Sequence, residues 1–417
     1  MSKLIHSWGN SSNKYIEAKE DLNINDLVLT YGNLNSYGDA GIPLGKYGYK
    51  STNHKLDPGF YSSSITIEDF VHENNKILYG IPGKSNVTLG GAVASDVHGK
   101  DSYWAGNFNN NLESIQIQLS NKDILVCDAK VNSEIFYSTI AGYGLTGSIL
   151  GIKFKENNTP YSNYFLSQTK KGTGIETLMK CFTEEKDTYT VAWIDLLGNK
   201  SNWILETSTI IRPGNNLDKI IQKSNTKELN FSLGFIGNNT FNTMRLINNT
   251  YFNLKKENEK IKNFSDIFYP IGFINNSKNI ANKRQIVQIQ FSLPKKYEIH
   301  LVELINLLIY KQKPILCSLK RLSKSSNNFN LSFTQNGWTV AVDFPKKYFN
   351  FNSIRHFYKK LIEFEGKIYL AKDSTMNESE FKSMYSNFDK WEKIVKKIDP
   401  DNIFQSELSN RLGLKKW

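Results

Sequence analysis

The stretch Ile81-Pro-Gly-Lys-Ser-Asn-Val-Thr-Leu-Gly-Gly-Ala-Val-Ala-Ser-Asp-Val-His-Gly-Lys100 decides how this chain is interpreted. Its glycines allow tight turns and a close approach of the backbone to another group. Successive backbone N–H groups in such a loop can hold a phosphate or a pyrophosphate. Taken alone, a glycine segment is more simply explained as a tight turn, so the neighbouring sequence has to decide between the two.

Two further glycine segments flank this stretch. Tyr31–Asp39 (YGNLNSYGD) follows an expected strand, and Ala141–Gly147 reads AGYGLTG. Neither they nor the first stretch contain the phosphate-binding pattern GxxxxGK[ST] or a GxGxxG that opens a helix in a βαβ unit, so both usual nucleotide fingerprints are absent. Glycines become rarer after Gly151. Three such segments in the first 155 residues favour a large phosphorylated cofactor.

Length and composition exclude several classes of protein. The chain has 417 residues, of which 39% are hydrophobic, so it can form two or three packed domains and is not disordered. Its three cysteines, Cys127, Cys181 and Cys317, are isolated, which excludes a disulfide framework and a CxxC metal site. No metal site is expected at His98 either, because no second ligand stands at a suitable spacing. The N-terminal residues lack an apolar stretch, and we expect a cytoplasmic protein.

The net charge of +12 leaves the kind of partner open. A basic chain can meet nucleic acid, an anionic membrane surface or phosphorylated substrates. The abundance of Lys, Asn and Ile explains the same charge equally well as a bias in composition. Because the chain lacks a dense basic block interleaved with aromatic residues, we do not expect nucleic acid as a partner.

Hydrophobic periodicity predicts an α+β fold. The expected strands fall into two groups with helices between them, which favours α+β over a doubly wound parallel sheet. The stretch between Asp39 and Ile65 lacks clear strands. Strands are predicted at 26–30, 112–119, 122–127, 147–154, 189–197, 286–293, 315–319 and 338–344, and helices at 66–74, 133–139, 297–311 and 351–363.

The glycine segments together resemble a known family. The pattern PG-x4-TLGGAVASDVHGK over 82–100, with NSYGD before it and GYGLTG after it, is similar to the FAD-binding domain of the vanillyl-alcohol-oxidase/PCMH superfamily. Within that superfamily it most resembles the decaprenylphosphoryl-β-D-ribose 2-oxidases. The resemblance continues in IYLAKDS at 368–374 and DPDNIF at 399–404, and more weakly between these regions, so it spans nearly the whole chain.

The resemblance implies a two-domain fold of the PCMH type. A FAD-binding domain at 1–160, completed by 367–417, would enclose a substrate-binding domain at 161–366 whose antiparallel sheet covers the flavin. Members of the superfamily that bind FAD covalently often use a histidine in the first loop. Here that loop reads Leu34-Asn35-Ser36, so FAD should be bound non-covalently. Asn35 replaces an arginine that is usual in the group, and Lys84 can supply a replacement charge.

The resemblance also implies the site residues. Lys372, Tyr37 and His98 would be catalytic, with Lys372 essential, and Lys100, Gln290, Lys320 and Lys372 would face the substrate. Without the resemblance, each lysine is more simply explained as a solvated charge, and His98 equally well as a buried, hydrogen-bonded histidine. The residues implied to bind FAD are Gly32, Asn33, Leu34, Asn35, Ser36, Tyr37, Gly38, Gly83, Thr88, Gly90, Gly91, Ser95, Asp96, His98, Ile149, Thr190 and Tyr369.

The implied activity is the oxidation of a secondary alcohol of a sugar, at the 2-hydroxyl of a polyprenyl-phospho-ribose. A partner keto-sugar reductase would then complete an epimerisation for cell-surface glycans. Such a lipid-linked substrate would bring the protein to the inner membrane as a peripheral protein. Lys372 or Lys320, in a dry site beside other cations, would have a lowered pKa and act as the base. Two alternatives remain: a FAD-dependent oxidase of a free sugar, polyol or aldonolactone, and a catalytically impaired scaffold with a shortened 39–65 stretch.

Overall fold

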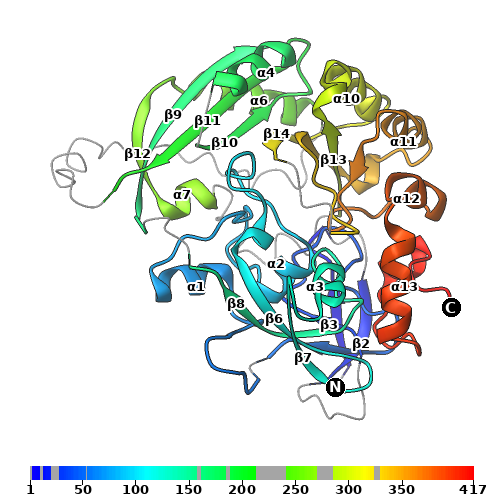
Figure 1. Ribbon diagram of the computed structural model, residues 1–417. Helices are drawn as coiled ribbons and strands as arrows, with labels where there is room; N and C mark the ends of the chain where they lie inside the picture. The colour runs from blue at the N-terminus through cyan, green and yellow to red at the C-terminus, as the bar shows by residue number, and fades with distance from the viewer. Residues whose placement is uncertain are drawn as a thin grey trace.

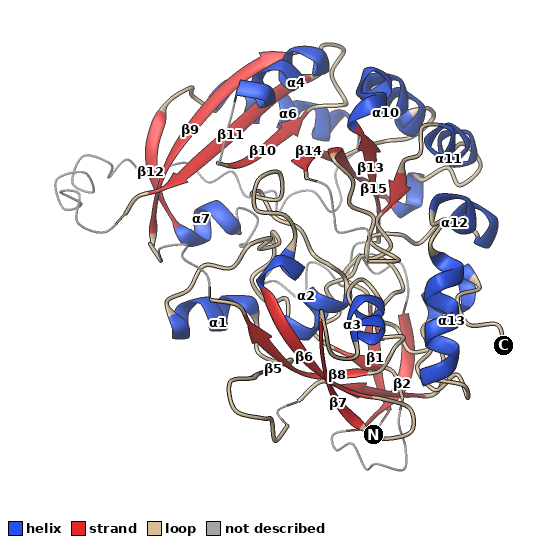
Figure 2. Ribbon diagram, viewed as in Figure 1, coloured by secondary structure: helices blue, strands red, loops and turns tan. Residues whose placement is uncertain are grey.

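The structure is a computed structural model that describes residues 2–9, 13–19, 28–52, 54–156, 161–184, 188–212, 241–269, 285–323 and 329–417. Helices and mostly antiparallel strands are mixed along the chain, which confirms the α+β class predicted from the sequence (Figures 1 and 2). The described residues form two four-stranded sheets and one eight-stranded sheet. No helix among them combines the length and the apolar character needed to cross a bilayer.

The first four-stranded sheet has the strand order β1-β2-β4-β3. The prediction that 39–65 lacks strands was wrong, because β4 and the start of a second sheet lie there. Strands of two to four residues are too short to show an alternating pattern in the sequence. Of the strand predicted at 26–30, only Thr30 falls in β3, and 26–27 lie outside the described residues. The strands are β1 (Ser2–His6), β2 (Asn13–Lys19), β3 (Thr30–Tyr31) and β4 (Tyr47–Lys50).

The second four-stranded sheet is antiparallel and has the order β5-β8-β6-β7. The predicted hairpin around Ser120 is confirmed as β6 and β7. The predicted N-cap Thr66 is also confirmed, since its side chain accepts a hydrogen bond from the Asp69 backbone N–H. The elements are β5 (Tyr61–Ser62), α1 (Ile67–Asn74), α2 (Leu89–Ala94), the 3-10 helix η1 (Phe108–Asn111), β6 (Leu112–Gln118), β7 (Ile124–Asp128), α3 (Ser133–Thr139) and β8 (Ser148–Phe154).

The eight-stranded sheet is antiparallel throughout, in the order β12-β9-β11-β10-β14-β15-β13-β16. Four of its strands match predicted ones, and the other four were missed. The strands are β9 (Tyr164–Thr173), β10 (Tyr189–Ile194), β11 (Asn202–Ile210), β12 (Glu259–Asn263), β13 (Ile286–Pro294), β14 (Leu316–Leu322), β15 (Gly337–Pro345) and β16 (Lys367–Ile368).

Helices cover the side of this sheet that faces away from α1, α2 and α3 (Figure 1). The helix predicted at 297–311 is present, but its first turns are the 3-10 helix η3. α7 (Phe264–Phe268) lies instead between the sheet and α1. The other helices associated with the sheet are α4 (Ile175–Glu184), α6 (Phe241–Leu254), η3 (Lys295–His300), α10 (Leu301–Ile309), η4 (Lys346–Tyr348) and α11 (Ile354–Glu363).

The last three helices return to the N-terminal part of the molecule, beside its blue and cyan strands in Figure 1. Trp391 is fully buried there and donates a hydrogen bond from Nε1 to the carbonyl of Ser138, 3.0 Å away. The C-terminal segment thus packs on the part of the chain that carries the glycine segments. The predicted PCMH arrangement and its boundaries at 160 and 366 stay predictions. The three helices are α12 (Glu378–Met384), α13 (Phe388–Ile398) and α14 (Glu407–Leu412).

Candidate active site

A cavity of about 310 Å³ lies where the glycine segments meet the eight-stranded sheet. This volume is at the lower end of the range usual for small-molecule and cofactor sites. Side chains at alternate positions of three strands face it from the sheet: Gln288 and Gln290, Ser318 and Lys320, and Ala341. The predicted site residues that line it are Gly32, Asn33, Leu34, Asn35, Ser36, Tyr37, Gly83, Thr88, Gly90, Gly91, Ser95, His98, Ile149, Gln290, Lys320, Tyr369 and Lys372.

Four residues assigned to the site by the resemblance do not line this cavity. Gly38 packs on the backbone of Asp373, where a Cβ would lie 1.7 Å from the carbonyl oxygen. Asp96 is buried elsewhere, as described below. Lys100 and Thr190 lie together beside a separate recess of about 10 Å³, and the Thr190 N–H donates to the Lys100 carbonyl at 2.8 Å.

Asp96 has hydrogen-bond partners that explain its burial without a cofactor. Its carboxylate accepts from Asn107 Nδ2 at 3.0 Å, from Ser332 Oγ at 2.8 Å and from Asn109. Burial raises its pKa, and these donors oppose that shift. The sequence motif therefore contains one residue whose task in this structure is to join the turn after α2 to the segment near residue 332.

The first loop is fixed to the second glycine segment through Asn86. Asn33 and Asn35 both donate from Nδ2 to the Asn86 carbonyl, at 2.9 and 3.0 Å. Lys84 donates to Asn35 Oδ1 at 3.1 Å, and its Nζ lies 3.9 Å from the centre of the Trp8 ring. Burial lowers the pKa of Lys84 well below 10.5, and the charge of Lys372 adds to this effect. Lys84 thus brings a cation next to Asn35.

Glycine is required where the segments approach each other. A Cβ on Gly32 would lie 2.4 Å from Thr88 Oγ1, the atom that caps α2 by accepting from the Gly91 N–H. A Cβ on Gly90 would lie 2.8 Å from that of Ser63. Gly83 differs, because a Cβ there would meet no protein atom within 4 Å. The cavity wall is therefore bare backbone with open space beside Gly83, a surface that fits the diphosphate of a dinucleotide cofactor.

Lys372 lies in the cavity against an aromatic ring and near a buried carboxyl group. Its Nζ is 4.0 Å from the centre of the Tyr37 ring. Burial lowers its pKa from 10.5 to about 8, and the charge of Asp343 opposes the shift. Asp343 itself accepts a hydrogen bond from Gln288, and its burial raises its pKa. The Lys372 ammonium is therefore close to the pH range in which it can release and accept a proton.

His98 joins Lys320 to Gln290. Lys320 Nζ lies 3.2 Å from His98 Nδ1, and Gln290 Nε2 lies 2.8 Å from His98 Nε2. Burial and the charges of Lys100 and Lys372 lower the pKa of Lys320 to about 7. Burial and the two cavity lysines lower the pKa of His98 well below 6.5. At neutral pH His98 is therefore an uncharged imidazole, which can donate at one ring nitrogen and accept at the other.

Tyr369 closes the cavity next to His98. Its ring stacks on Phe333 with the ring centres 4.3 Å apart, and its hydroxyl donates to the Ser95 carbonyl at 2.9 Å. The ring centres of Tyr369 and His98 are 5.7 Å apart. This residue, which follows β16, therefore links the eight-stranded sheet to the end of α2.

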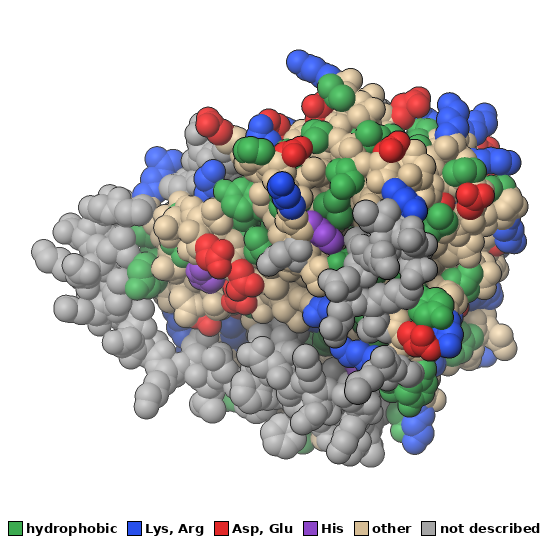
Figure 3. All heavy atoms as spheres, turned by 90° about the horizontal axis from the view of Figure 1, so that it is seen from below, with side chains coloured by type: hydrophobic (Ala, Val, Ile, Leu, Met, Phe, Trp, Pro, Cys, Tyr) green, Lys and Arg blue, Asp and Glu red, His purple; other side chains and the backbone are tan. Residues whose placement is uncertain are grey.

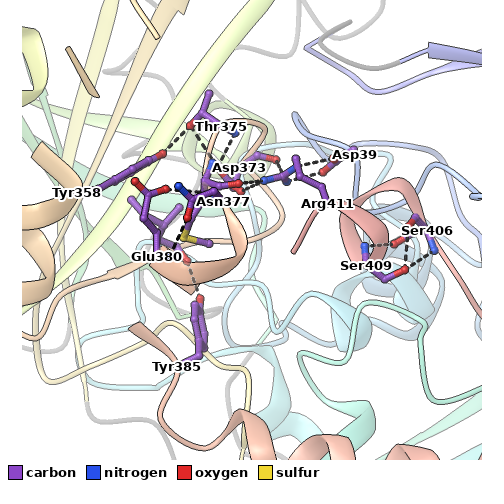
Figure 4. A network of polar contacts seen from close by, with 12 residues as sticks. Asp39, Tyr358, Asp373, Thr375, Asn377, Glu380, Tyr385, Ser406, Ser409 and Arg411 are labelled. Carbon is purple, nitrogen blue, oxygen red and sulfur yellow. Dashed lines mark hydrogen bonds and ion pairs between the residues drawn. The ribbon is translucent and has the colours of Figure 1, made fainter. Parts of the chain in front are cut away.

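Arg411 of α14 ties the first loop to the segment that holds Lys372 (Figure 4). Its guanidinium makes two hydrogen bonds of 2.8 Å to the Asp39 carboxylate and one of 2.8 Å to that of Asp373. The Tyr37 N–H also donates to the Ala371 carbonyl at 3.0 Å. Tyr37 and Lys372 are thus held together by an ion cluster behind the cavity.

Sequence reasoning missed three residues that shape the site. Gln288 was recognisable in principle, because it stands two residues from Gln290 and side chains two apart lie on one face of a strand. Asp343 pairs with Gln288 across β13 and β15, which becomes visible only with the strand register. Arg411 could not be linked to the site, because its two carboxylate partners, Asp39 and Asp373, are distant from it in the sequence. Within the described ranges, no group of three or more His, Cys, Asp and Glu residues could hold a metal ion.

Comparison with known proteins indicates the class of enzyme. A family model described as D-arabinono-1,4-lactone oxidase matches residues 337–412, which include Lys372 and Arg411. The decaprenylphosphoryl-beta-D-ribose oxidase of Mycolicibacterium smegmatis is 27% identical over 348 residues, 80% of this chain and 75% of that protein. The chain is an FAD-linked oxidoreductase. A second relative of this oxidoreductase, an uncharacterised protein in the mprA 5′ region of Streptomyces coelicolor, is 31% identical over 118 residues, 28% of this chain and 31% of that protein.

Replacing Arg411 with methionine should destabilise the protein and loosen its flavin. The change leaves the nearly buried carboxylates of Asp39 and Asp373 without their cation, which typically costs about 3–5 kcal/mol of unfolding free energy. Urea unfolding, followed by circular dichroism and by flavin absorbance, would measure both effects. The matched control is Lys382→Met, which removes an exposed, solvent-screened ion pair with Glu378 and should leave stability close to that of the wild type. Equal losses in the two variants would contradict the structural role of Arg411.

Proposed function

We propose that this oxidoreductase oxidises the 2-hydroxyl of a polyprenyl-phosphate-linked ribose, as the first half of an epimerisation that a partner keto-sugar reductase completes. The observation that most supports this is the group of buried lysines, Lys84, Lys320 and Lys372, which line the same cavity as the glycine segments. Buried ammonium groups favour an anionic ligand, and a sugar phosphodiester is one. The name of the Mycolicibacterium relative gives the same substrate class.

FAD bound in this cavity would supply the acceptor for the hydride of the alcohol carbon. The bare backbone at Gly83, with the loop at 32–38, would hold its diphosphate. We propose that it is held non-covalently. Among the described residues that line the cavity, His98 is the one histidine, no cysteine is present, and both ring nitrogens of His98 already face Gln290 and Lys320.

The lysines would divide the remaining tasks. Lys372 in its neutral form accepts the proton of the substrate hydroxyl, because its lowered pKa makes that form accessible near neutral pH. Lys320 orients the substrate together with His98 and Gln290. A phosphate that approaches Lys320 raises the pKa of this lysine again, so the ammonium form is restored when it is needed to hold the anion. One buried site would thereby contain both a base, Lys372, and a cation, Lys320.

A second candidate is oxidation of a free sugar, polyol or aldonolactone. The match of residues 337–412 to the D-arabinono-1,4-lactone oxidase model favours this candidate. Turnover of soluble sugars or lactones without any lipid phosphate would decide for it. The scaffold alternative was suggested by a short 39–65 stretch without clear strands, and the presence of β4 and β5 removes the second of these two grounds.

The purified protein should be yellow and should release its flavin on denaturation. Because we expect no bond between FAD and a side chain, acid or heat precipitation should leave the flavin in the supernatant. Absorbance spectra of the supernatant and of the dissolved precipitate measure its distribution. Flavin that stays with the precipitated protein would exclude non-covalent binding.

Replacing Lys372 with methionine should retain bound FAD and abolish substrate-driven bleaching of the flavin. General-base catalysis usually contributes about 10²–10⁴-fold to the rate, so the rate of bleaching should fall by at least about 10²-fold. Anaerobic stopped-flow absorbance with a polyprenyl-phospho-ribose measures this step. Lys359→Met, on the exposed face of α11, is the matched control and should bleach at the wild-type rate. Normal bleaching by the Lys372 variant would remove this residue from the mechanism.

The wild-type kcat/KM should rise with pH between about 7 and 9. The base acts as a neutral amine, so activity is lost as the pH falls through the lowered pKa of Lys372, which is about 8. The rising limb of the pH–rate profile should disappear from the residual activity of the methionine variant. An activity that instead falls as the pH rises through this range would indicate that the charged lysine is the active form.

A further inference from the structure

Two exposed segments far from each other in the sequence meet at one end of the helices α10 and α11. The turn after α10 and the segment before α11 are joined by Gln312, which donates to the Asn350 carbonyl at 2.8 Å and accepts from the Asn350 N–H at 2.9 Å. Figure 1 shows the two helices side by side. Together the segments carry a set of aromatic and basic side chains that we call the aromatic–lysine patch: Tyr310, Lys311, Lys313, Lys347, Tyr348 and Phe351.

The aromatic rings of this patch are unusually open to solvent. The exposed fractions are 59% for Tyr310, 45% for Tyr348 and 44% for Phe351. Single exposed apolar residues are ordinary on a protein surface, but these three large rings stand on two segments that are hydrogen-bonded to each other. The segment before α11 is packed, because its Phe349 is buried and the ring of Phe349 contacts that of Phe351 with centres 4.9 Å apart. The exposed ring of Phe351 therefore rests on a buried residue.

Lysines lie directly beside these rings. Lys311 Nζ is 5.3 Å from the centre of the Tyr310 ring, and Lys313 Nζ is 4.6 Å from that of Tyr348. Lys347 Nζ is 5.4 Å from the Tyr348 ring. The side chains of Lys311, Lys313 and Lys347 are exposed. Each ring thus has an ammonium group next to it at the surface.

Acidic residues are missing from the sequence around the patch. No Asp or Glu occurs in residues 304–342 or 344–362, and Asp343 between these ranges is buried. On the face shown in Figure 3, acidic and basic side chains of the described residues are interspersed. The patch therefore combines exposed aromatic rings with lysines, and the segments that carry them contain no exposed acidic residue.

We propose that the aromatic–lysine patch docks the protein on the anionic surface of a lipid bilayer. Tyrosine and phenylalanine rings enter the headgroup region, where one part of the surroundings is apolar and the other is wet, and lysines beside them attract anionic headgroups. Charge complementarity favours a bilayer over a neutral protein surface. The proposal rests on the proposed function only in that a polyprenyl-linked substrate would be met at the same surface.

Co-sedimentation with vesicles tests this docking on the full-length holoprotein. The protein should bind vesicles of phosphatidylcholine mixed with phosphatidylglycerol, should bind phosphatidylcholine vesicles far more weakly, and should dissociate at high salt. Each lysine near an anionic surface contributes about fivefold to binding, so Lys311→Glu/Lys347→Glu should weaken it at least about 25-fold. Tyr348→Ser/Phe351→Ser should weaken it at least about tenfold at unchanged charge.

The matched control is Lys393→Glu/Lys396→Glu on the exposed face of α13, which changes the charge by the same amount. It should keep near-wild-type binding, and circular dichroism and flavin absorbance should show that all three variants are folded. Equal loss in the control and in the patch variant would overturn the proposal, as would binding only to nucleic acid or to another protein. Because turnover of a detergent-dispersed substrate needs no bilayer, its persistence in a protein that binds no vesicles would leave the proposed function standing.

Discussion

The geometry of the cavity depends on the ion cluster of Arg411. The guanidinium binds Asp39, which ends the first glycine segment, and Asp373, which directly follows Lys372. Two carboxylates that are nearly free of solvent would repel each other and lose their hydration without this cation. With it, the loop that carries Tyr37 and the segment that carries Lys372 lie in contact. Lys372 and the loop that carries Tyr37 are therefore positioned by a residue that does not itself line the cavity.

The cavity contains several lysines and few acidic groups. Burial lowers the pKa of these lysines, which reduces the repulsion among them. Lys84, Lys320 and Lys372 would repel one another if all were charged, and desolvation adds to this repulsion. The outcome is a lowered pKa at each lysine and a neutral His98. An incoming anion reverses part of this effect because it stabilises the ammonium forms. The site is thus electrostatically prepared for a negatively charged ligand.

Much of the fold was predictable where a pattern was local and long enough. The α1 cap at Thr66, the β6–β7 hairpin and the strands β13 and β15 all follow from neighbouring residues. Strands β4 and β5 were missed because they are too short to show alternation. The cavity lining was largely implied by resemblance, whereas Asp343 and Arg411 depend on strand register and on contacts between distant segments. Asp96 was assigned to the cofactor site for the same reason: its hydrogen bonds with Asn107 and with the distant Ser332 are not visible in the sequence.

The hydrogen bond from Trp391 to Ser138 and the ion cluster of Arg411 have a consequence for biosynthesis. Both connect the region of the glycine segments with residues that leave the ribosome long after it. Contacts between such distant segments form late and slow the folding of a domain. The N-terminal third must therefore wait, with its cavity incomplete, until the C-terminal helices have been synthesised. Flavin would therefore bind only after translation is complete.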